Sequence, residues 1–208
     1  MKKPIPITTL FLDIGGVLLT DGWSQPFRAR AMKRFHLDPQ EMEDRHHLTF
    51  DTYEEGKLTL DEYLARVVFY RKRSFTCAQF REFMFAQSKP FPEMINLIRR
   101  LKMNYGLKIA VVSNEARELN AHRIRTFKLN QFVDFFVSSC FVHLRKPDVD
   151  IFRLALDLAQ TPAHQIVYIE NTAMFVQIAE GLGIRSILHT DYKSTCAKLA
   201  SFGLDVTG

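Results

Sequence analysis

Side chains that could bind and attack an anion stand at the ends of hydrophobic runs in this sequence. Asp13 closes the first run, and Ser113 closes the second. Lys146 lies in "RKPD" after the third run, and Glu170 closes the fourth. A carboxylate can attack phosphorus and form an aspartyl-phosphate, which splits one hard displacement into two easier ones. A lysine and a hydroxyl group would then bind the negative charge of the transferred group.

Two glycines follow the first acid in "LFLDIGGVLLTDGW", and they leave the backbone around Asp13 without side chains. Gly15 and Gly16 would let backbone N–H groups approach a phosphoryl group and would turn the chain. A magnesium ion would need hard oxygen ligands, such as Asp13, a backbone carbonyl and the acid or amide after the fourth run. Each residue alone also fits a turn or a helix cap, so the prediction depends on the whole set.

Buried strands must position these residues. Continuous apolar runs without alternation predict strands covered on both faces, here at 8–14, 107–113, 134–139, 166–170 and 185–189. Helical segments alternate with the later strands, at roughly 116–128, 148–159 and 172–182. This alternation predicts an α/β fold with a Rossmann-like parallel sheet and helices on both faces. In such sheets, ligands bind at the carboxyl ends of the strands.

The interval 21–92 has no strand pattern and predicts an inserted α-helical cap. Three helix starts carry capping residues: Asp38 before Pro39, Thr59 with Glu62, and Thr76 with Gln79. The segment 88–93 would return the chain to the sheet. We therefore predict two domains, a core of residues 1–20 and 93–208 and a helical cap of residues 21–92.

Composition limits the classes of function. The chain has 208 residues, of which 47% are hydrophobic and 25% charged, as is ordinary for a soluble globular protein. The apolar runs are too short to cross a bilayer, which argues against a membrane protein. The net charge of +5 suits an anionic substrate, but the basic residues are scattered, which argues against nucleic-acid binding. Three distant cysteines favour free thiols in a reducing cytoplasm: Cys77, Cys140 and Cys196.

The adjacent histidines and the single tryptophan in the predicted cap have no predicted chemical role. His46 and His47 are adjacent on a predicted cap helix, a spacing that points their side chains in different directions. We expect no shared metal site there and place both histidines at the surface or the cap edge. Trp23 lies near the cap edge and could shape a pocket, although packing is its default role.

Taken together, the motifs resemble the haloacid dehalogenase-like (HAD) hydrolase superfamily, and more narrowly its bacterial sugar-phosphate phosphatases with a small helical (C1-type) cap. The resemblance rests on "FLDIGGVL", "VVSNEA", "RKPDVDIF" and "VYIENTAMFVQIAEGLGI", and on "YEEGKLTLDEYL" in the cap. It implies a cytoplasmic, Mg²⁺-dependent phosphatase that acts on a small phosphorylated metabolite. It implies no nucleic-acid or membrane partner and leaves the oligomeric state open.

The resemblance also implies a role for each motif residue. Asp13 and Lys146 would be catalytic, with Asp13 as the nucleophile. The phosphate-binding residues would be Gly15, Gly16, Ser113, Asn114 and Lys146. The magnesium ligands would be Asp13, the Gly15 carbonyl, Glu170 and Asn171.

Two departures from the family pattern affect the expected activity. Relatives usually carry an Asp two residues after the nucleophile, as general acid and base, and this chain has Gly15 there. Losing such a group typically costs about 10²–10⁴-fold in rate. Glu170 and Asn171 replace the usual two acids of motif four, which predicts a weaker magnesium site.

Either the substrate has a good leaving group, or a cap residue or a water molecule substitutes for the missing acid, or the protein is a poor catalyst. Two other functions also stay open. A haloacid dehalogenase would attack carbon with Asp13 and need no metal, but that branch usually has Thr at the position of Val17 and Ser-x-Asn in motif four. A catalytically impaired protein of the same fold would bind a phosphorylated ligand without turning it over.

Overall fold

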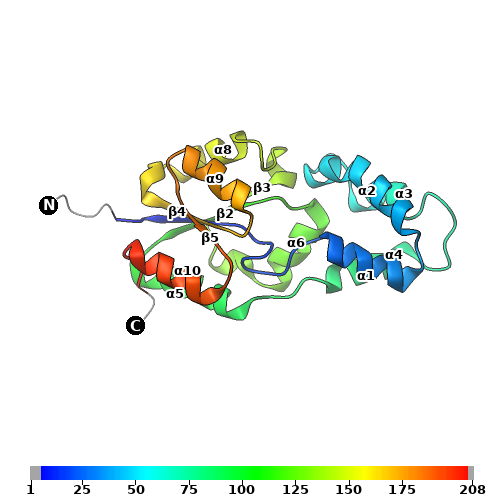
Figure 1. The fold of residues 1–208 in the computed structure, drawn as a ribbon, viewed down its shortest axis with the longest axis horizontal. Helices are drawn as coiled ribbons and strands as arrows, with labels where there is room; N and C mark the ends of the chain where they lie inside the picture. The colour runs from blue at the N-terminus through cyan, green and yellow to red at the C-terminus, as the bar shows by residue number, and fades with distance from the viewer. Residues whose placement is uncertain (1–5, 206–208) are drawn as a thin grey trace.

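A computed structural model describes residues 6–205, which contain a five-stranded parallel sheet (Figure 1). The strand order is β3-β2-β1-β4-β5, so β1 lies in the middle. In register, Leu12 of β1 pairs with Val111 of β2 and Ile169 of β4. The strands are β1 (Thr9–Leu12), β2 (Lys108–Ser113), β3 (Phe135–Ser138), β4 (Ile166–Glu170) and β5 (Arg185–Leu188). The predicted parallel α/β sheet is confirmed, and each predicted strand overlaps one of these five.

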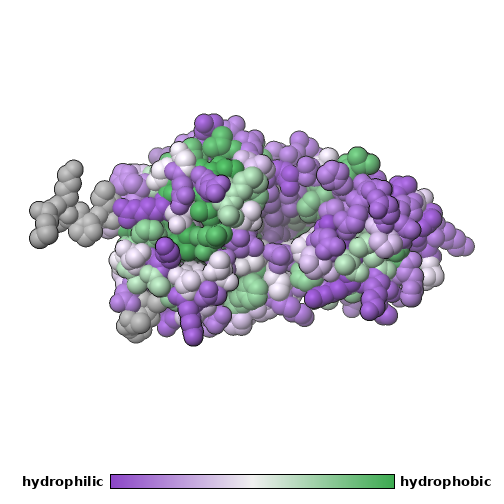
Figure 2. All heavy atoms as spheres, in the orientation of Figure 1, coloured by the Kyte–Doolittle hydropathy of each residue, from purple (hydrophilic) through white to green (hydrophobic). Residues whose placement is uncertain are grey.

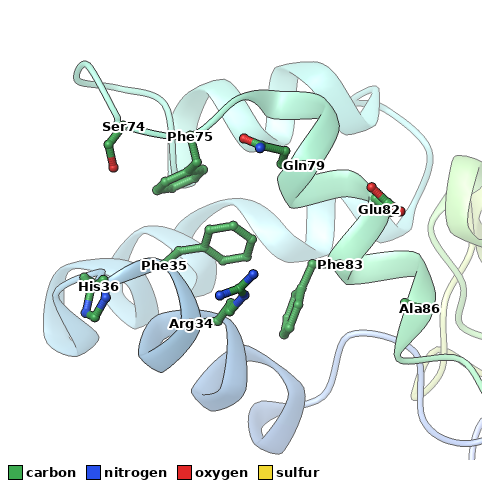
Figure 3. A pocket seen from close by; sticks show the side chains of 9 residues that line it. All are labelled: Arg34, Phe35, His36, Ser74, Phe75, Gln79, Glu82, Phe83 and Ala86. Atoms are coloured by element: carbon green, nitrogen blue, oxygen red, sulfur yellow. The ribbon is translucent and has the colours of Figure 1, made fainter.

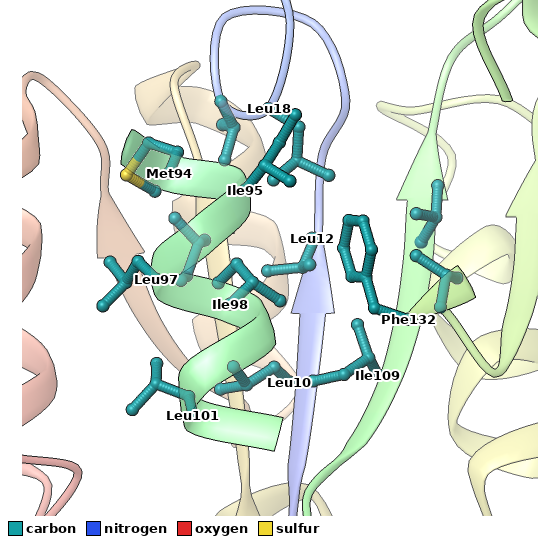
Figure 4. Packing of buried hydrophobic residues seen from close by; sticks show 14 of the residues in the cluster. Leu10, Leu12, Leu18, Met94, Ile95, Leu97, Ile98, Leu101, Ile109 and Phe132 are labelled. Carbon is teal, nitrogen blue, oxygen red and sulfur yellow. The ribbon is translucent and has the colours of Figure 1, made fainter. Parts of the chain in front are cut away.

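Both faces of the sheet are covered, because alternate residues of β1 belong to different apolar clusters. Leu10 and Leu12 share a cluster with Ile98 of α5 (Figure 4). Phe11 belongs to the opposite cluster, together with Phe152 of α8. One face is covered by α5 (Pro92–Tyr105), α6 (Arg117–Thr126) and α10 (Tyr192–Ser201), and the other by α8 (Asp150–Ala159) and α9 (Ala173–Gly181). Short helices complete this layer: η1 (Leu129–Gln131), α7 (Ser139–Val142) and η2 (Ala163–Gln165).

Between β1 and α5, a stretch described throughout, the chain forms four helices at one end of the molecule (Figure 1). They are α1 (Gln25–Phe35), α2 (Pro39–Glu54), α3 (Leu60–Val67) and α4 (Cys77–Ala86). Their apolar side chains form a cluster of their own, which also includes Ala116 and Leu119 beside the sheet. We propose that residues 21–92 are a cap domain on a core of residues 1–20 and 93–208, of which 1–5 and 206–208 lie outside the described residues.

Three of the cap helices begin where their capping residues predict. The Asp38 side chain accepts from the backbone N–H of Glu41, and Thr59 and Thr76 each form a capping box. Helix α1 was not predicted, because Ser24 makes no side-chain cap bond and the first turn carries no acid. Helices α5 and α10 were not predicted either.

The chain enters and leaves the cap through two segments that lie side by side. The Thr20 N–H donates to the Lys89 carbonyl at 2.8 Å, and the Phe91 N–H donates to the Leu18 carbonyl at 2.9 Å. The return segment predicted at 88–93 therefore fixes the residues just before Asp21.

The outer surface is mostly polar. Figure 2 shows hydrophilic side chains over most of one face, with hydrophobic side chains gathered over α9 and the neighbouring strand β5. The large exposed hydrophobic residues of those two elements are Met174 and Leu188. None of the helices within residues 6–205 is long and apolar enough to cross a membrane.

Candidate active site

The residues predicted to do chemistry meet at the carboxyl end of the sheet. Asp13 directly follows β1, Ser113 ends β2 and Glu170 ends β4. Lys146 comes from the segment between α7 and α8. Because β1 lies between β2 and β4, the three strand ends are neighbours. The structure brings Asp13, Lys146 and Glu170 into direct contact.

Lys146 is the centre of this contact and is 1% exposed. Its Nζ lies 3.1 Å from Oδ1 of Asp13 and 2.6 Å from Oε2 of Glu170. Burial alone would lower the pKa of Lys146, but the two carboxylates outweigh that penalty and raise it. The ammonium group therefore stays charged where an anion would bind.

Tyr168 is a site residue that the sequence did not reveal. It lies inside the apolar run of β4 and reads as core, but its hydroxyl group accepts from Lys146 Nζ at 3.0 Å and donates to Glu170. The one indication in the sequence is that Tyr168 lies two positions before Glu170, because residues two apart in a strand point to the same side of the sheet. Tyr168 and Glu170 thus hold the ammonium from one face of the sheet.

Asn114 positions Lys146 through its backbone. Its carboxamide donates to the Lys146 carbonyl and accepts from the Lys146 N–H, both at 2.8 Å. This pair of bonds fixes the lysine segment against the end of β2. A contact between Asn114 and phosphate remains a prediction.

Ser113 presents a buried hydroxyl group that still needs a partner. The residue is 1% exposed, and its Oγ has no hydrogen-bond partner within residues 6–205. The same holds for Ser138, its register partner on β3. Leaving a buried polar group unpaired costs about 1–3 kcal/mol, so a bound acceptor such as a phosphoryl oxygen would satisfy it.

Three of the predicted metal ligands lie together: Asn171, Glu170 and the Gly15 carbonyl. The Asn171 carboxamide can donate to the Gly15 carbonyl at 3.2 Å and to Oε1 of Glu170 at 2.9 Å. Turned by 180°, it would present its oxygen to two other oxygens, an arrangement that a cation stabilises. Together with Asp13 these are the hard oxygen donors that magnesium prefers, so the residues fit the predicted ion.

The absence of a side chain at Gly16 leaves space for the carboxamide of Asn171. Its φ is +70°, and a Cβ on it would lie 2.1 Å from Nδ2 of Asn171. Its N–H donates to the Leu19 carbonyl at 2.8 Å and closes the turn after Asp13. A glycine is therefore required here for both backbone angle and space, and its contact with phosphate remains a prediction.

A second acid that the sequence did not reveal lies above Gly15. A Cβ placed on Gly15 would lie 3.6 Å from Oδ1 of Asp21. Partial burial raises the pKa of Asp21, the charge of Asp13 raises it further, and Arg123 opposes both effects. Asp21 lies near Gly15 because the turn over residues 14–19 brings the chain back on itself. No local sequence pattern predicts this contact.

A cavity of about 240 Å³ lies between the cap and the sheet ends. Cap and core residues line it, including Asp21, Trp23, Glu54 and Asn114. Burial raises the pKa of Glu54 to about 7 even though Arg145 donates to its Oε2 from two nitrogens, at 3.0 and 2.7 Å. Trp23 is buried and donates to the Tyr63 hydroxyl at 3.0 Å, so it both packs and lines the cavity.

Two other features of the cap lie away from these residues. A cavity of about 580 Å³ lies between α1 and α4, and none of its lining residues belongs to the predicted site (Figure 3). His46, which we expected at the surface or the cap edge, is instead buried, with Nδ1 2.7 Å from the Tyr63 hydroxyl. Its position on the inner side of α2 explains the difference, because the helix packs against α3.

Comparisons with solved structures show the same fold in known proteins. This chain and a HAD family enzyme of Bacteroides thetaiotaomicron, solved with magnesium and inorganic phosphate, superpose with a TM-score of 0.74 at 19% identity, over 91% of this chain and 98% of that one. A predicted HAD-like hydrolase of Porphyromonas gingivalis gives a TM-score of 0.74 at 20% identity, over 94% and 98%. An L-2-haloacid dehalogenase gives a TM-score of 0.63 at 18% identity, over 88% of this chain and 86% of that one. At these identities the likeness shows the fold.

Curated relatives match over shorter stretches. Haloacid dehalogenase-like hydrolase domain-containing protein 3 of Xenopus laevis is 39% identical over 66 residues, which are 32% of this chain and 27% of that protein. A putative pyrophosphatase, PpaX, of Caldanaerobacter subterraneus is 29% identical over 91 residues, which are 44% and 41%. The chain thus matches less than half the length of these two relatives. The profile of the haloacid dehalogenase-like hydrolases, in contrast, matches residues 7–183. This chain therefore belongs to the haloacid dehalogenase-like hydrolases.

Proposed function

We propose that this protein is a magnesium-dependent phosphatase that hydrolyses a small phosphorylated metabolite through an aspartyl-phosphate on Asp13. The contact that carries the proposal joins the Asp13 carboxylate to the Lys146 ammonium at 3.1 Å. It supports the proposal because a carboxylate that can act as a nucleophile lies beside a fixed positive charge, at the end of a strand whose neighbour ends in Ser113, a residue whose hydroxyl group has no hydrogen-bond partner within residues 6–205.

The residues divide the reaction into two displacements. Asp13 attacks the phosphorus of the bound monoester, and the bond to the leaving-group oxygen breaks. Lys146 neutralises charge on the phosphoryl group, and Ser113 donates a hydrogen bond to one of its oxygens. Water then attacks the phosphorus, the bond to Asp13 breaks, and inorganic phosphate leaves.

Magnesium fits the oxygen groups beside Asp13. Asp13, the Gly15 carbonyl, Glu170 and Asn171 would hold it, and the ion supplies positive charge that offsets the charge of the transferred group. Lys146 and Tyr168 already engage one oxygen of Glu170. Because Asn171 is neutral, we propose a weaker magnesium site than two acids would give.

Relatives and cavity size support a small phosphorylated substrate. The Bacteroides thetaiotaomicron enzyme was solved with magnesium and inorganic phosphate, and one curated relative is named a putative pyrophosphatase. The cavity of about 240 Å³ above the strand ends is below the range of about 300–1,000 Å³ for drug-sized ligands.

A screen of phosphate monoesters tests the proposal. Wild-type protein and Asp13→Asn are incubated with sugar phosphates and 4-nitrophenyl phosphate, in magnesium or in EDTA, and inorganic phosphate is measured. We expect the wild-type protein to release phosphate only with magnesium, and Asp13→Asn to match the protein-free control. The proposal fails if folded wild-type protein releases none, or if Asp13→Asn retains the wild-type rate.

A metal-independent dehalogenase is a second candidate, because position 15 lacks an acid and the fold resembles an L-2-haloacid dehalogenase. Chloride release from 2-chloropropionate in EDTA, without any phosphate release in the screen, would favour it. Tight binding of a phosphorylated ligand without turnover would favour a protein that only binds.

A further inference from the structure

We infer that Asp21 is the proton-transfer residue of this site and takes the place of the side chain that Gly15 lacks. The inference rests on the proposed phosphatase function and adds a residue that neither the motifs nor the matched relatives assign. Its basis is the position of one carboxylate over one glycine.

The Asp21 carboxylate occupies the space into which a side chain at position 15 would project. A Cβ on Gly15 would lie 3.6 Å from both Cα and Oδ1 of Asp21, which is ordinary van der Waals contact. A carboxylate carried on that Cβ would therefore extend into the neighbourhood of Oδ1. The chain thus offers an acid at this place from a different position in the sequence.

The segment before Asp21 is held firmly. Thr20 donates from its N–H to the Lys89 carbonyl at 2.8 Å, and its Oγ1 both donates to Gln87 O and accepts from Lys89 N at 3.0 Å. The guanidinium of Arg123, fully buried, donates to the Thr20 carbonyl and to Glu115. A catalytic group needs such support to keep its geometry.

Asp21 is also accessible to a ligand. The residue is exposed and lines the cavity between the cap and the sheet ends. Glu54 is the other carboxylate of the cap in that cavity, but Arg145 binds its Oε2 with two N–H donors. Asp21 has no comparable cation bound to its oxygens within the described chain, so it is the freer of the two to exchange a proton.

Asp21 transfers a proton in both displacements. When Asp13 attacks phosphorus, protonated Asp21 gives its proton to the leaving-group oxygen, and the alcohol departs. Asp21, now a carboxylate, takes a proton from the incoming water as that oxygen attacks the aspartyl-phosphate. The products are the alcohol and inorganic phosphate, and Asp13 is again a carboxylate while Asp21 is again protonated, so protons and atoms balance with water as the second reactant.

Substrates with different leaving groups test this role. We compare wild-type protein with Asp21→Asn, using phenyl phosphate as the ester with the poor leaving group and 4-nitrophenyl phosphate as the ester with the good one. For phenyl phosphate, kcat/KM should fall by about 10²–10⁴-fold. For 4-nitrophenyl phosphate, kcat/KM should fall less than kcat, with a burst of 4-nitrophenolate, because hydrolysis of the aspartyl-phosphate still lacks its base. Asp157→Asn, an exposed acid on α8, should behave like the wild-type protein.

Moving the acid back to position 15 gives the second variant. Asp21→Ala should lose activity on phenyl phosphate, and Gly15→Asp/Asp21→Ala should regain at least about tenfold of it, because the new carboxylate enters the vacated space. Equal losses for both esters with Asp21→Asn, or no recovery in the double variant, would overturn the role of Asp21. If wild-type protein turns over neither ester, or Asp13→Asn turns over both, the proposed function itself fails.

Discussion

The ammonium group of Lys146 lies 3.1 Å from the carboxylate of Asp13, although 133 positions separate the two residues in sequence. The same ammonium group also binds Glu170 at 2.6 Å, so one buried cation balances two buried acids. Chemistry and stability are therefore coupled at this point, because removing the cation leaves both acids without a counter-charge.

Replacing this cation should damage both fold and activity. In Lys146→Met, two buried carboxylates lose their partner, and we expect the free energy of unfolding to fall by about 3–5 kcal/mol. Phosphate release should disappear. Urea denaturation and the phosphatase assay measure the two effects. Lys193→Met removes an exposed lysine of α10 and should change stability by no more than about 0.5 kcal/mol.

The double variant Lys146→Met/Glu170→Gln separates the two effects. It should recover part of the lost stability, since one uncompensated charge is gone, but no activity. A stable, fully active Lys146→Met protein would contradict the assigned role of the lysine.

Adding a methyl group to Gly16 should destabilise the protein and weaken magnesium binding. The residue has a φ of +70°, and its Cβ would overlap Asn171 at 2.1 Å. We expect Gly16→Ala to lose about 1–3 kcal/mol, with a smaller rise in Tm on adding magnesium. Gly15→Ala is the matched control for stability, because its Cβ has 3.6 Å of clearance. Equal stability of both variants would argue against this geometry.

Charging the amide at position 171 should make the site depend on magnesium. In Asn171→Asp, a carboxylate oxygen would face the Gly15 carbonyl and Glu170, at the distances over which one orientation of the Asn171 amide can donate to them. We expect a lower Tm than wild type in EDTA and a larger rise on adding magnesium. Calorimetry should show tighter magnesium binding. Unchanged Tm in EDTA and unchanged affinity would show that position 171 lies outside the ion site.

Burial of His46 should make the protein less stable in acid. Burial and, second to it, the nearby charge of Arg28 lower the pKa of His46 from 6.5 to about 4. The unfolded chain then binds the proton more tightly, so this contribution is present above about pH 6.5 and is lost as the pH falls toward 4. The free energy of unfolding should fall by about 3 kcal/mol, because the pKa of His46 falls from 6.5 to about 4 and each pKa unit is worth about 1.4 kcal/mol.

Urea denaturation at about pH 7.5 and pH 4.5 measures this effect as a difference between wild type and His46→Asn. The variant should lose less stability than the wild-type protein over that interval. His47→Asn, at the exposed neighbouring position, is the matched control and should keep the wild-type dependence. If all three proteins lose the same free energy of unfolding between the two pH values, protonation of His46 does not destabilise the folded protein.

The strand ends could be predicted because strands buried on both faces have continuous apolar runs in the sequence. The polar residue that ends each run then had to lie at the ligand-binding edge, as Asp13, Ser113 and Glu170 do. Lys146 lies between α7 and α8 rather than at a strand end, and its place was predicted from its position after the third apolar run. Its partner Tyr168 was not predicted, because a tyrosine inside an apolar run cannot be distinguished from core until the strand direction and its neighbours are known.

Asp21 and α1 were not predicted for different reasons. Asp21 reaches Gly15 only after the chain folds back through the turn at 14–19, a contact through space that no spacing encodes. Ser24, the residue before α1, makes no capping hydrogen bond, so the start of this helix lacks the local pattern that marked α2, α3 and α4. Its helical state depends on burial of Phe27, Ala31 and Met32 in the cap cluster.

Trapping the covalent intermediate tests the proposed reaction most directly. Asp21→Asn protein is mixed with 4-nitrophenyl phosphate and magnesium, quenched in acid within the burst, digested and examined by mass spectrometry. The account predicts one phosphoryl group on the peptide that contains Asp13, and none in Asp13→Asn or in EDTA. A phosphoryl group on another residue, or steady phosphate release by wild-type protein with no phosphorylated peptide in either protein, would contradict it.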